Sequence, residues 1–181
     1  MKKTILLAAA ILLTAGIGYA QHGHDNNGNQ PHHHQHHEHH QHPRQPQGPS
    51  GLTFDQALAM AFPDMLSTKK EGRWTAVYDS GRKLLGYAVD SRPASDGIKG
   101  YAGETPVMIA FSPKKKITGV YLLQNQETPG FARRVEQAGF YAGWNGLTVK
   151  KALKKKVDTV SGATFTSRAV AESVRAALAT L

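Results

Sequence analysis

The sequence contains no cysteine, which excludes disulfides, thiolate metal sites and cysteine nucleophiles. A chain without thiols also suits an oxidising compartment, where an unpaired thiol is a liability. The sequence shows no paired acid and base, no nucleophile triad and no nicotinamide-binding fingerprint. These absences argue against a substrate-converting enzyme. The residues from Leu52 to Leu181 are numerous enough to form a single domain held together by its apolar core alone.

A long hydrophobic run is also missing. The apolar stretch Ile5–Ile17 is shorter than the roughly 20 residues of a transmembrane helix. Lys2 and Lys3 precede it and Gly18-Tyr19-Ala20 follows it, which is the pattern of a secretory signal peptide over residues 1–20. An uncleaved anchor is the alternative, whereas a lipoprotein anchor would need a cysteine. We therefore expect an exported protein, in the periplasm or at the outer face of the cytoplasmic membrane.

Residues 21–50 form a low-complexity segment of His, Gln, Asn, Gly and Pro. It has too few apolar residues to offset chain entropy, so we expect a disordered tether. All ten histidines of the chain lie here, and clustered imidazoles can chelate copper, nickel or zinc. Incidental metal binding by a tether is the simpler interpretation. The alternative is a His-rich periplasmic metal-binding protein in which the folded domain is an anchor, with these candidate ligands: His32, His33, His34, His36, His37, His39, His40 and His42.

The formal net charge is +9, and the positive charge is concentrated in two lysine clusters. One is Lys114–Lys116, and the other comprises Lys150, Lys151 and Lys154–Lys156. A basic surface can meet nucleic acid, anionic lipid or an acidic protein. An exported protein rarely meets nucleic acid, so we expect no nucleic-acid partner. Three interpretations stay open: solvated turns, contact with an anionic membrane surface and contact with an acidic partner.

The folded part begins with a predicted helix over Thr53–Phe62, because Thr53 and Gln56 have the spacing of a capping box and Pro63 ends the helix. Two β-hairpins follow, each with apolar strands around a polar turn. Their predicted strands are Trp74–Tyr78 with Leu84–Val89, and Pro106–Phe111 with Ile117–Leu123.

Two further helices are predicted in the C-terminal part. Phe131–Phe140 follows Pro129-Gly130, and Arg168–Leu181 carries an apolar stripe of Val170, Val174, Ala177 and Leu181. The order of elements predicts an α+β fold: a single domain over residues 51–181, with a mostly antiparallel sheet flanked by helices. Its C-terminal helix follows a Ser-Gly-Ala-Thr segment.

That segment, Ser161-Gly162-Ala163-Thr164, places small and hydroxyl-bearing residues at a helix start, where free N–H groups and the helix dipole suit an anion. With Asp158 three residues before it, it resembles the attachment motif of the FMN-binding domain family. The resemblance implies that a flavin transferase joins FMN to Thr164 through a phosphoester bond, and that Asp158 is part of what the transferase recognises. Thr166 is the alternative acceptor. Thr166 and Ser167 either cap the last helix or donate to phosphate oxygens.

Two other segments resemble the same family. Gly100–Pro106 is similar to its glycine-rich approach to the first long hairpin, and Glu127-Thr128-Pro129-Gly130 with Phe131 matches its Glu-Thr-Pro-Gly loop. Three motifs in family order are far more specific than one. The loop suits a flavin because Gly130 permits close backbone approach, Thr128 offers a hydroxyl and Phe131 can cover an isoalloxazine edge. An ordinary strand-to-helix loop is the alternative.

The resemblance extends to the covalent-FMN domains of the sodium-translocating NADH:quinone reductase and of the Rnf complex. Each of these domains is part of one subunit of its membrane complex. It implies a free-standing exported flavoprotein that carries electrons to or from a membrane electron-transport complex. The implied partners are that complex, or another redox protein, and the flavin transferase. A sensor or structural domain that keeps the fold without covalent flavin is a further alternative.

Overall fold

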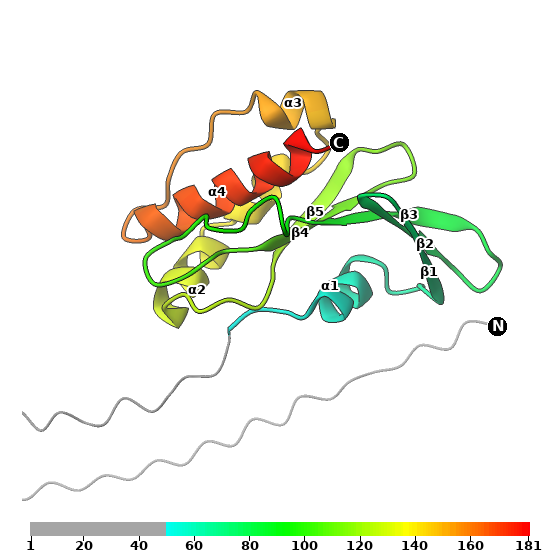
Figure 1. The fold of residues 1–181 in the computed structure, drawn as a ribbon, viewed down its shortest axis with the longest axis horizontal. Helices are drawn as coiled ribbons and strands as arrows, with labels where there is room; N and C mark the ends of the chain where they lie inside the picture. The colour runs from blue at the N-terminus through cyan, green and yellow to red at the C-terminus, as the bar shows by residue number, and fades with distance from the viewer. Residues whose placement is uncertain (1–49) are drawn as a thin grey trace, which may run out of the picture. The chain divides into compact units, whose positions relative to one another are not determined.

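The computed structural model describes residues 50–181, which form one α+β domain around a five-stranded antiparallel sheet (Figure 1). The strands lie in sequence order, each paired with the next: β1 (Ser67–Glu71), β2 (Trp74–Tyr78), β3 (Leu84–Asp90), β4 (Val107–Phe111) and β5 (Ile117–Leu122). The helices are α1 (Phe54–Ala61), α2 (Pro129–Gln137), the 3-10 turn η1 (Phe140–Trp144), α3 (Val149–Leu153) and α4 (Thr164–Ala179). The predicted fold class is confirmed.

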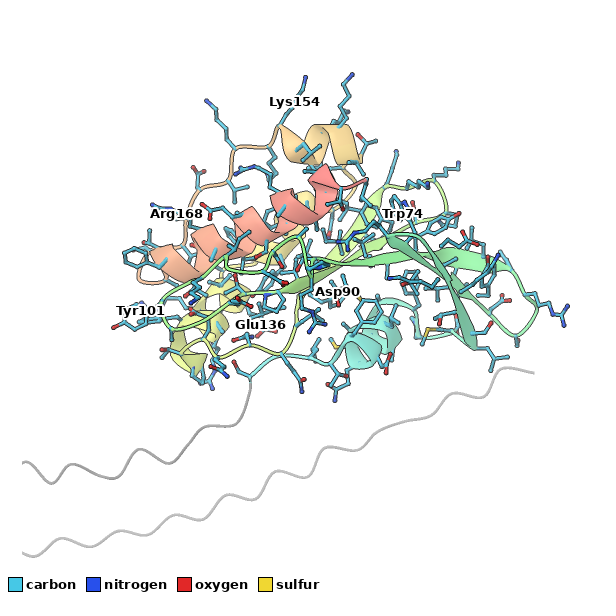
Figure 2. All side chains as sticks on the ribbon, viewed as in Figure 1. Trp74, Asp90, Tyr101, Glu136, Lys154 and Arg168 are labelled. Atoms are coloured by element: carbon cyan, nitrogen blue, oxygen red, sulfur yellow. The ribbon has the colours of Figure 1, made fainter. Side chains whose placement is uncertain are left out.

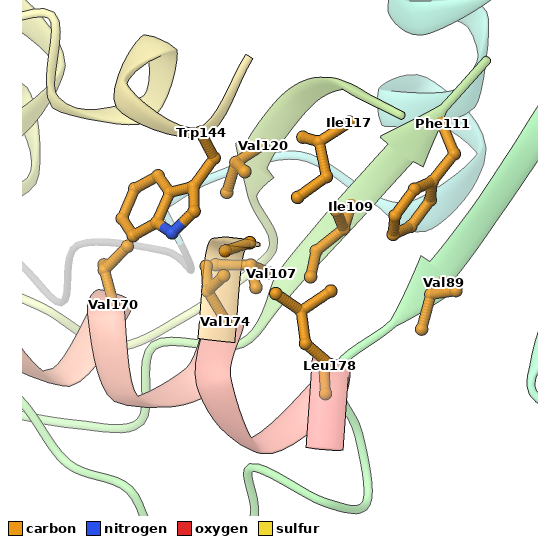
Figure 3. Packing of buried hydrophobic residues seen from close by; sticks show 12 residues of the cluster. Val89, Val107, Ile109, Phe111, Ile117, Val120, Trp144, Val170, Val174 and Leu178 are labelled. Carbon is orange, nitrogen blue, oxygen red and sulfur yellow. The ribbon is translucent and has the colours of Figure 1, made fainter. Parts of the chain in front are cut away.

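The sheet is covered on both faces, and β4 contributes to two apolar cores because successive side chains of a strand point to opposite faces. Val107, Ile109 and Phe111 face α4, where they pack with Trp144 and Val174 (Figure 3). On the other face, Met108 and Ala110 pack with Leu58 and Phe62 of the α1 region. The sheet is thereby sandwiched between α4 and α1.

The local predictions for the N-terminal half are confirmed. Thr53 Oγ1 accepts a hydrogen bond from the Gln56 N–H at 3.1 Å, and the Gln56 side chain accepts from the Thr53 N–H at 2.8 Å, which completes the capping box. Both predicted hairpins form. The strand β1 was not predicted, because all of its residues are exposed and its sequence has no apolar alternation. It exists through pairing with β2, and its lysines suit the edge of a sheet.

The boundaries predicted for the C-terminal half need correction. The helix α2 begins at Pro129 and ends at Gln137, because Gly139 takes a left-handed conformation and starts η1. The short helix α3 was not predicted. The last helix begins at Thr164 instead of Arg168, and Leu181 lies beyond its end, so Leu178 takes the buried position expected for Leu181. The Ser-Gly-Ala-Thr segment therefore runs directly into α4.

Within residues 50–181, no helix is long and apolar enough to cross a membrane. The predicted signal peptide and all but the last residue of the predicted His-rich tether lie outside the described residues.

Candidate functional site

A pocket of about 270 Å³ lies where the starts of α2 and α4 meet the loop that leads into β4. Each of the three motifs found in the sequence contributes to it. Tyr101 comes from the glycine-rich loop, Phe131 from the Glu-Thr-Pro-Gly loop, and the rest from the α4 start: Gly162, Ala163, Thr164, Phe165 and Thr166. The fold thus brings together segments that are about 60 residues apart in the sequence.

Aromatic side chains form the rim of this pocket. Tyr101 is 64% exposed and projects from the end of the domain where α4 begins (Figure 2), and Phe165 is 62% exposed. The rings of Tyr101 and Phe131 meet edge to face with centroids 4.9 Å apart. Exposed aromatic rings gathered around one hollow indicate a flat apolar ligand. Tyr101 and Phe165 were not predicted as site residues, although Tyr101 lies within the glycine-rich segment and Phe165 directly follows Thr164.

Thr164 is the first residue of α4 and is half-buried in the pocket wall. Its hydroxyl makes no hydrogen bond within residues 50–181. The helix has Ala163 at its N-cap, so no side chain caps its first turn. Because the first N–H groups of a helix have no partner within it, the α4 start offers donors to an anion next to the Thr164 hydroxyl.

Thr166 and Ser167 have a different environment, since both are fully buried. The Thr166 hydroxyl donates a hydrogen bond to Glu127. The Ser167 hydroxyl donates to the Ala163 carbonyl at 2.9 Å and accepts from the Val160 N–H at 3.0 Å. Of the two roles expected for these residues, capping of the helix is wrong, because α4 begins at Thr164 with Ala163 as its N-cap. Their hydroxyls are committed within the protein.

Glu127 is only 3% exposed, and its carboxylate joins three segments. Besides the bond from Thr166, it accepts from the N–H groups of Ala102 at 2.6 Å and Gly103 at 2.9 Å. A Cβ on Gly100 would come within 2.8 Å of this carboxylate, so glycine permits the approach. Glu127 therefore ties the loop of Tyr101 to α4, and it does not line the pocket.

The electrostatics of Glu127 are set by two opposing effects. Burial would raise its pKa, but the hydrogen bonds from Thr166 and from the backbone N–H groups of Gly103, Ala102 and Tyr101 outweigh it, so its pKa lies below the ordinary value. The carboxylate is thus ionised at neutral pH.

The other predicted residues lie around this centre. Thr128 is the exposed N-cap of α2 and makes no side-chain capping bond. Pro129 lines a separate hollow, and Gly130 is exposed with open space around it. Of the Glu-Thr-Pro-Gly-Phe segment, only Phe131 lines the pocket. Ser161 and Asp158 are exposed in the irregular segment before α4.

The Ser-Gly-Ala-Thr segment needs its glycine for conformational reasons. Gly162 has a φ of +72°, in the left-handed region that residues with a side chain rarely adopt. This turn brings the chain round into α4 and leaves the Thr164 side chain at the pocket.

The comparison with protein families agrees with this geometry. The FMN-binding domain family matches residues 100–179, which include all three motifs and every residue of the pocket. Residues 100–179 belong to the FMN-binding domain family. The FMN-binding domain thus begins at the glycine-rich loop and ends with α4. The N-terminal part of the described chain, with α1 and the strands β1 to β3, precedes it.

Curated relatives of the chain are components of ion-translocating complexes. A component of the proton-translocating ferredoxin:NAD(+) oxidoreductase complex of Clostridium ljungdahlii is 30% identical over 112 residues, 58% of this chain and 57% of the relative. The corresponding component of the Na(+)-translocating ferredoxin:NAD(+) oxidoreductase complex of Acetobacterium woodii is 28% identical, over 52% of this chain and 48% of the relative. A component of the ion-translocating oxidoreductase complex of Shewanella piezotolerans is 33% identical, over 45% of this chain and 43% of the relative. The chain spans about half the length of these relatives.

Among solved structures, NqrC of Shewanella oneidensis matches with a TM-score of 0.41 and 24% identity, over 62% of this chain and 63% of that one.

Within residues 50–181, no group of three or more His, Asp or Glu side chains is arranged to hold a metal ion. The eight histidines predicted as copper, nickel or zinc ligands lie outside the described residues.

Proposed function

We propose that this protein is an exported electron carrier whose FMN is joined by a phosphoester bond to Thr164. The observation that carries the proposal is the contrast between two threonines of one motif. Both threonines line the aromatic pocket, but Thr164 is half-buried and its hydroxyl makes no hydrogen bond within residues 50–181, whereas Thr166 is fully buried and its hydroxyl donates to Glu127. Thr164 is thus the accessible acceptor.

The residues around Thr164 fit an FMN group. Tyr101, Phe131 and Phe165 offer ring faces and edges to a flat isoalloxazine. The uncapped first turn of α4 offers N–H groups to a phosphate. FMN, when bound, supplies the exchange of one or two electrons, and the protein supplies its position and surroundings.

The size of the pocket supports covalent attachment. At about 270 Å³ it is smaller than the roughly 300–1,000 Å³ of typical ligand sites, so it can receive only part of a flavin. A covalent tether makes tight enclosure unnecessary, because the bound ligand cannot diffuse away. It also leaves part of the cofactor at the surface, where another redox protein can approach it.

The attachment needs an activated donor, since free FMN carries a phosphate monoester without a good leaving group. Flavin adenine dinucleotide, in which FMN is linked to AMP by a pyrophosphate bond, supplies one. The Thr164 oxygen attacks the phosphorus of the FMN half, a new P–O bond forms and the pyrophosphate P–O bond breaks. AMP leaves, the hydroxyl proton is released and no electrons are transferred. A flavin transferase is the partner that catalyses this step, and we propose that the exposed Asp158 is part of its recognition site.

A membrane redox complex is the proposed electron partner, because the curated relatives are components of such complexes. The lysine clusters offer a second contact. Lys116 and Thr148 form a β-bridge, which places the turn of Lys114–Lys116 beside the start of α3, where the second cluster begins. No Asp or Glu occurs between residues 137 and 157. We propose that this lysine surface meets the anionic face of a membrane.

The test is the mass of denatured protein after co-expression with a flavin transferase. Denaturation removes non-covalent flavin, so the wild type should gain the mass of FMN less one water, and Thr164→Val should gain nothing. Thr159→Val is the matched control, because Thr159 is an exposed hydroxyl in the same segment, and it should be labelled fully. Full labelling of Thr164→Val would contradict the assignment. A wild type that gains no mass would favour a domain that functions without covalent flavin.

A further inference from the structure

The side chain of Arg134 lies against the attachment motif. Arg134 follows Phe131 by three residues on α2, so the two share a helix face. Phe131 lines the pocket, and the Arg134 guanidinium lies over Gly162. A Cβ built on Gly162 would overlap Nη1 of Arg134 and come within 3.2 Å of its Cζ. The guanidinium is thereby placed two residues from the proposed acceptor, Thr164.

This arginine has no electrostatic partner in the described part of the chain. The two ion pairs within residues 50–181 join Lys69 to Glu71 and Arg92 to Asp90, and no hydrogen bond from the Arg134 guanidinium is formed there. The carboxylate of Glu127 is buried and is occupied by Thr166 and the loop of Tyr101. A guanidinium carries five N–H donors in a planar fork that matches phosphate oxygens. Arg134 therefore presents unused donors and a full charge beside the pocket.

We propose that Arg134 binds the phosphate that links FMN to Thr164. This inference rests on the proposed function, and it names the residue that neutralises the cofactor's charge. After attachment, the phosphodiester carries one negative charge, which the guanidinium can pair with by two parallel hydrogen bonds. During transfer, the same donors stabilise charge on the phosphoryl oxygens.

Glycine at position 162 has a second role beside Arg134. Besides permitting the left-handed turn, Gly162 leaves the space that the Arg134 guanidinium occupies. A larger residue would push the guanidinium away from the segment to which the phosphate is attached.

The decisive experiment compares the thermal stability of loaded and unloaded protein for the wild type, Arg134→Gln and Arg133→Gln. Arg133 is the matched control, since it is an exposed arginine on the same helix that lines the other hollow. Loading is verified by intact mass. We expect the wild type and Arg133→Gln to show the same increase in Tm on loading, and Arg134→Gln a smaller one. Arg134→Lys keeps the charge but not the planar fork, so its increase in Tm on loading should lie between those of the wild type and Arg134→Gln. Equal increases for all variants would overturn the proposal.

A second measurement needs no transferase and covers the case in which Arg134→Gln is not loaded. Free FMN and riboflavin differ only in the phosphate, so the ratio of their affinities for unloaded protein isolates the phosphate contact. We expect the wild type and Arg133→Gln to share one preference for FMN, and Arg134→Gln to show a preference about tenfold smaller, as for the loss of one hydrogen-bonded charge pair. The N–H groups at the start of α4 remain in every variant.

The proposal fails if Arg134→Gln keeps the full FMN preference of the wild type, or if it is slow to load but shows the full increase in Tm once loaded. Arg134 would then act elsewhere, for example in transferase recognition. Failure of the wild type itself to acquire FMN would instead count against the proposed function.

Discussion

The Thr166 hydroxyl donates a hydrogen bond to the buried carboxylate of Glu127, which stands 39 residues earlier in the chain. The same carboxylate accepts from the N–H groups of Ala102 and Gly103, next to Tyr101. One side chain therefore fixes the start of α4, which carries Thr164, relative to the loop that carries the rim of the pocket. The geometry of the proposed flavin site depends on this contact, although Glu127 does not line the pocket.

Replacing Glu127 by glutamine should weaken the domain and change its response to acid. Glutamine is nearly isosteric but loses the charge-assisted hydrogen bonds, at a cost of about 2 kcal/mol. The pKa of Glu127 is lowered in the folded state, so its contribution to stability is present at neutral pH. That contribution is lost as the pH falls below about 4, towards the lowered pKa. Urea unfolding at pH 7 and pH 3.5 should therefore show a smaller acid-induced loss for Glu127→Gln than for the wild type.

The exposed Glu136 provides the control for this experiment. Glu136→Gln should unfold like the wild type at both pH values. An unchanged acid response in Glu127→Gln would show that the buried carboxylate does not contribute to the pH dependence of stability.

Thr164→Val and Thr166→Val should have opposite effects on stability and on flavin attachment. Thr166→Val removes a buried donor from Glu127 and should lower the free energy of unfolding by about 1–3 kcal/mol, while Thr164 is still labelled. Thr164→Val should change stability by about 0.5 kcal/mol or less and abolish labelling. Denaturant unfolding and intact mass, measured on the same samples, check both. Loss of label in a folded Thr166→Val variant alone would move the acceptor to Thr166.

Alanine at Gly162 should destabilise the domain by about 1–2 kcal/mol, because the left-handed backbone crowds a Cβ. Alanine at Gly130 is the control. Gly130 lies inside α2 with open space around it, so Gly130→Ala should stabilise by about 0.5–1 kcal/mol. Combining Gly162→Ala with Arg134→Ala removes the overlap with the guanidinium and should recover part of the loss. Denaturant unfolding gives the free energy of unfolding of the wild type and the three variants. A Gly162→Ala variant as stable as the wild type would contradict the expected backbone strain at position 162.

Tyr101 should quench the fluorescence of attached flavin. Its ring is exposed at the pocket rim, so Tyr101→Leu should leave stability within about 0.5 kcal/mol of the wild type while it raises flavin emission. Tyr101→Phe keeps the ring but loses the readily oxidised phenol that quenches by electron transfer, so its emission should also rise, towards that of Tyr101→Leu. Emission per mole of covalent flavin is the measurement. Equal emission from Tyr101→Leu and the wild type would place the isoalloxazine away from Tyr101.

The His-rich segment can be separated from the flavin site. Replacing residues 22–42 by a Gly/Ser sequence of equal length removes all ten histidines. We expect binding of copper, nickel and zinc to fall sharply while FMN attachment is unchanged, because no candidate metal cluster occurs within residues 50–181. Isothermal titration with each metal, alongside intact mass, gives both readouts. Metal binding that survives the replacement would contradict the assignment of those histidines.

Some features of this protein followed from local patterns in the sequence. The capping box of Thr53 and Gln56 and the two hairpins depend on neighbouring residues, so their spacing was sufficient to predict them. The three motifs predicted the family, because each is a run of residue types at fixed short spacing. These motifs also predicted that Thr164 and Phe131 belong to one flavin site. Both residues line the same pocket, and their contact with a flavin stays a prediction.

Other features of the fold and of the site depend on contacts between distant segments, so only the tertiary structure decides them. The exposed strand β1 forms only because β2 pairs with it, and α4 extends back to Thr164 into the turn set by Gly162. The motif predicted that Glu127 contacts the flavin, but hydrogen bonds from Ala102, Gly103 and Thr166 hold its buried carboxylate away from the pocket. The family resemblance ranked Thr164 above Thr166, but the residue types alone do not, because two threonines in one motif are chemically alike. Burial separates them, and burial is a property of the packed chain.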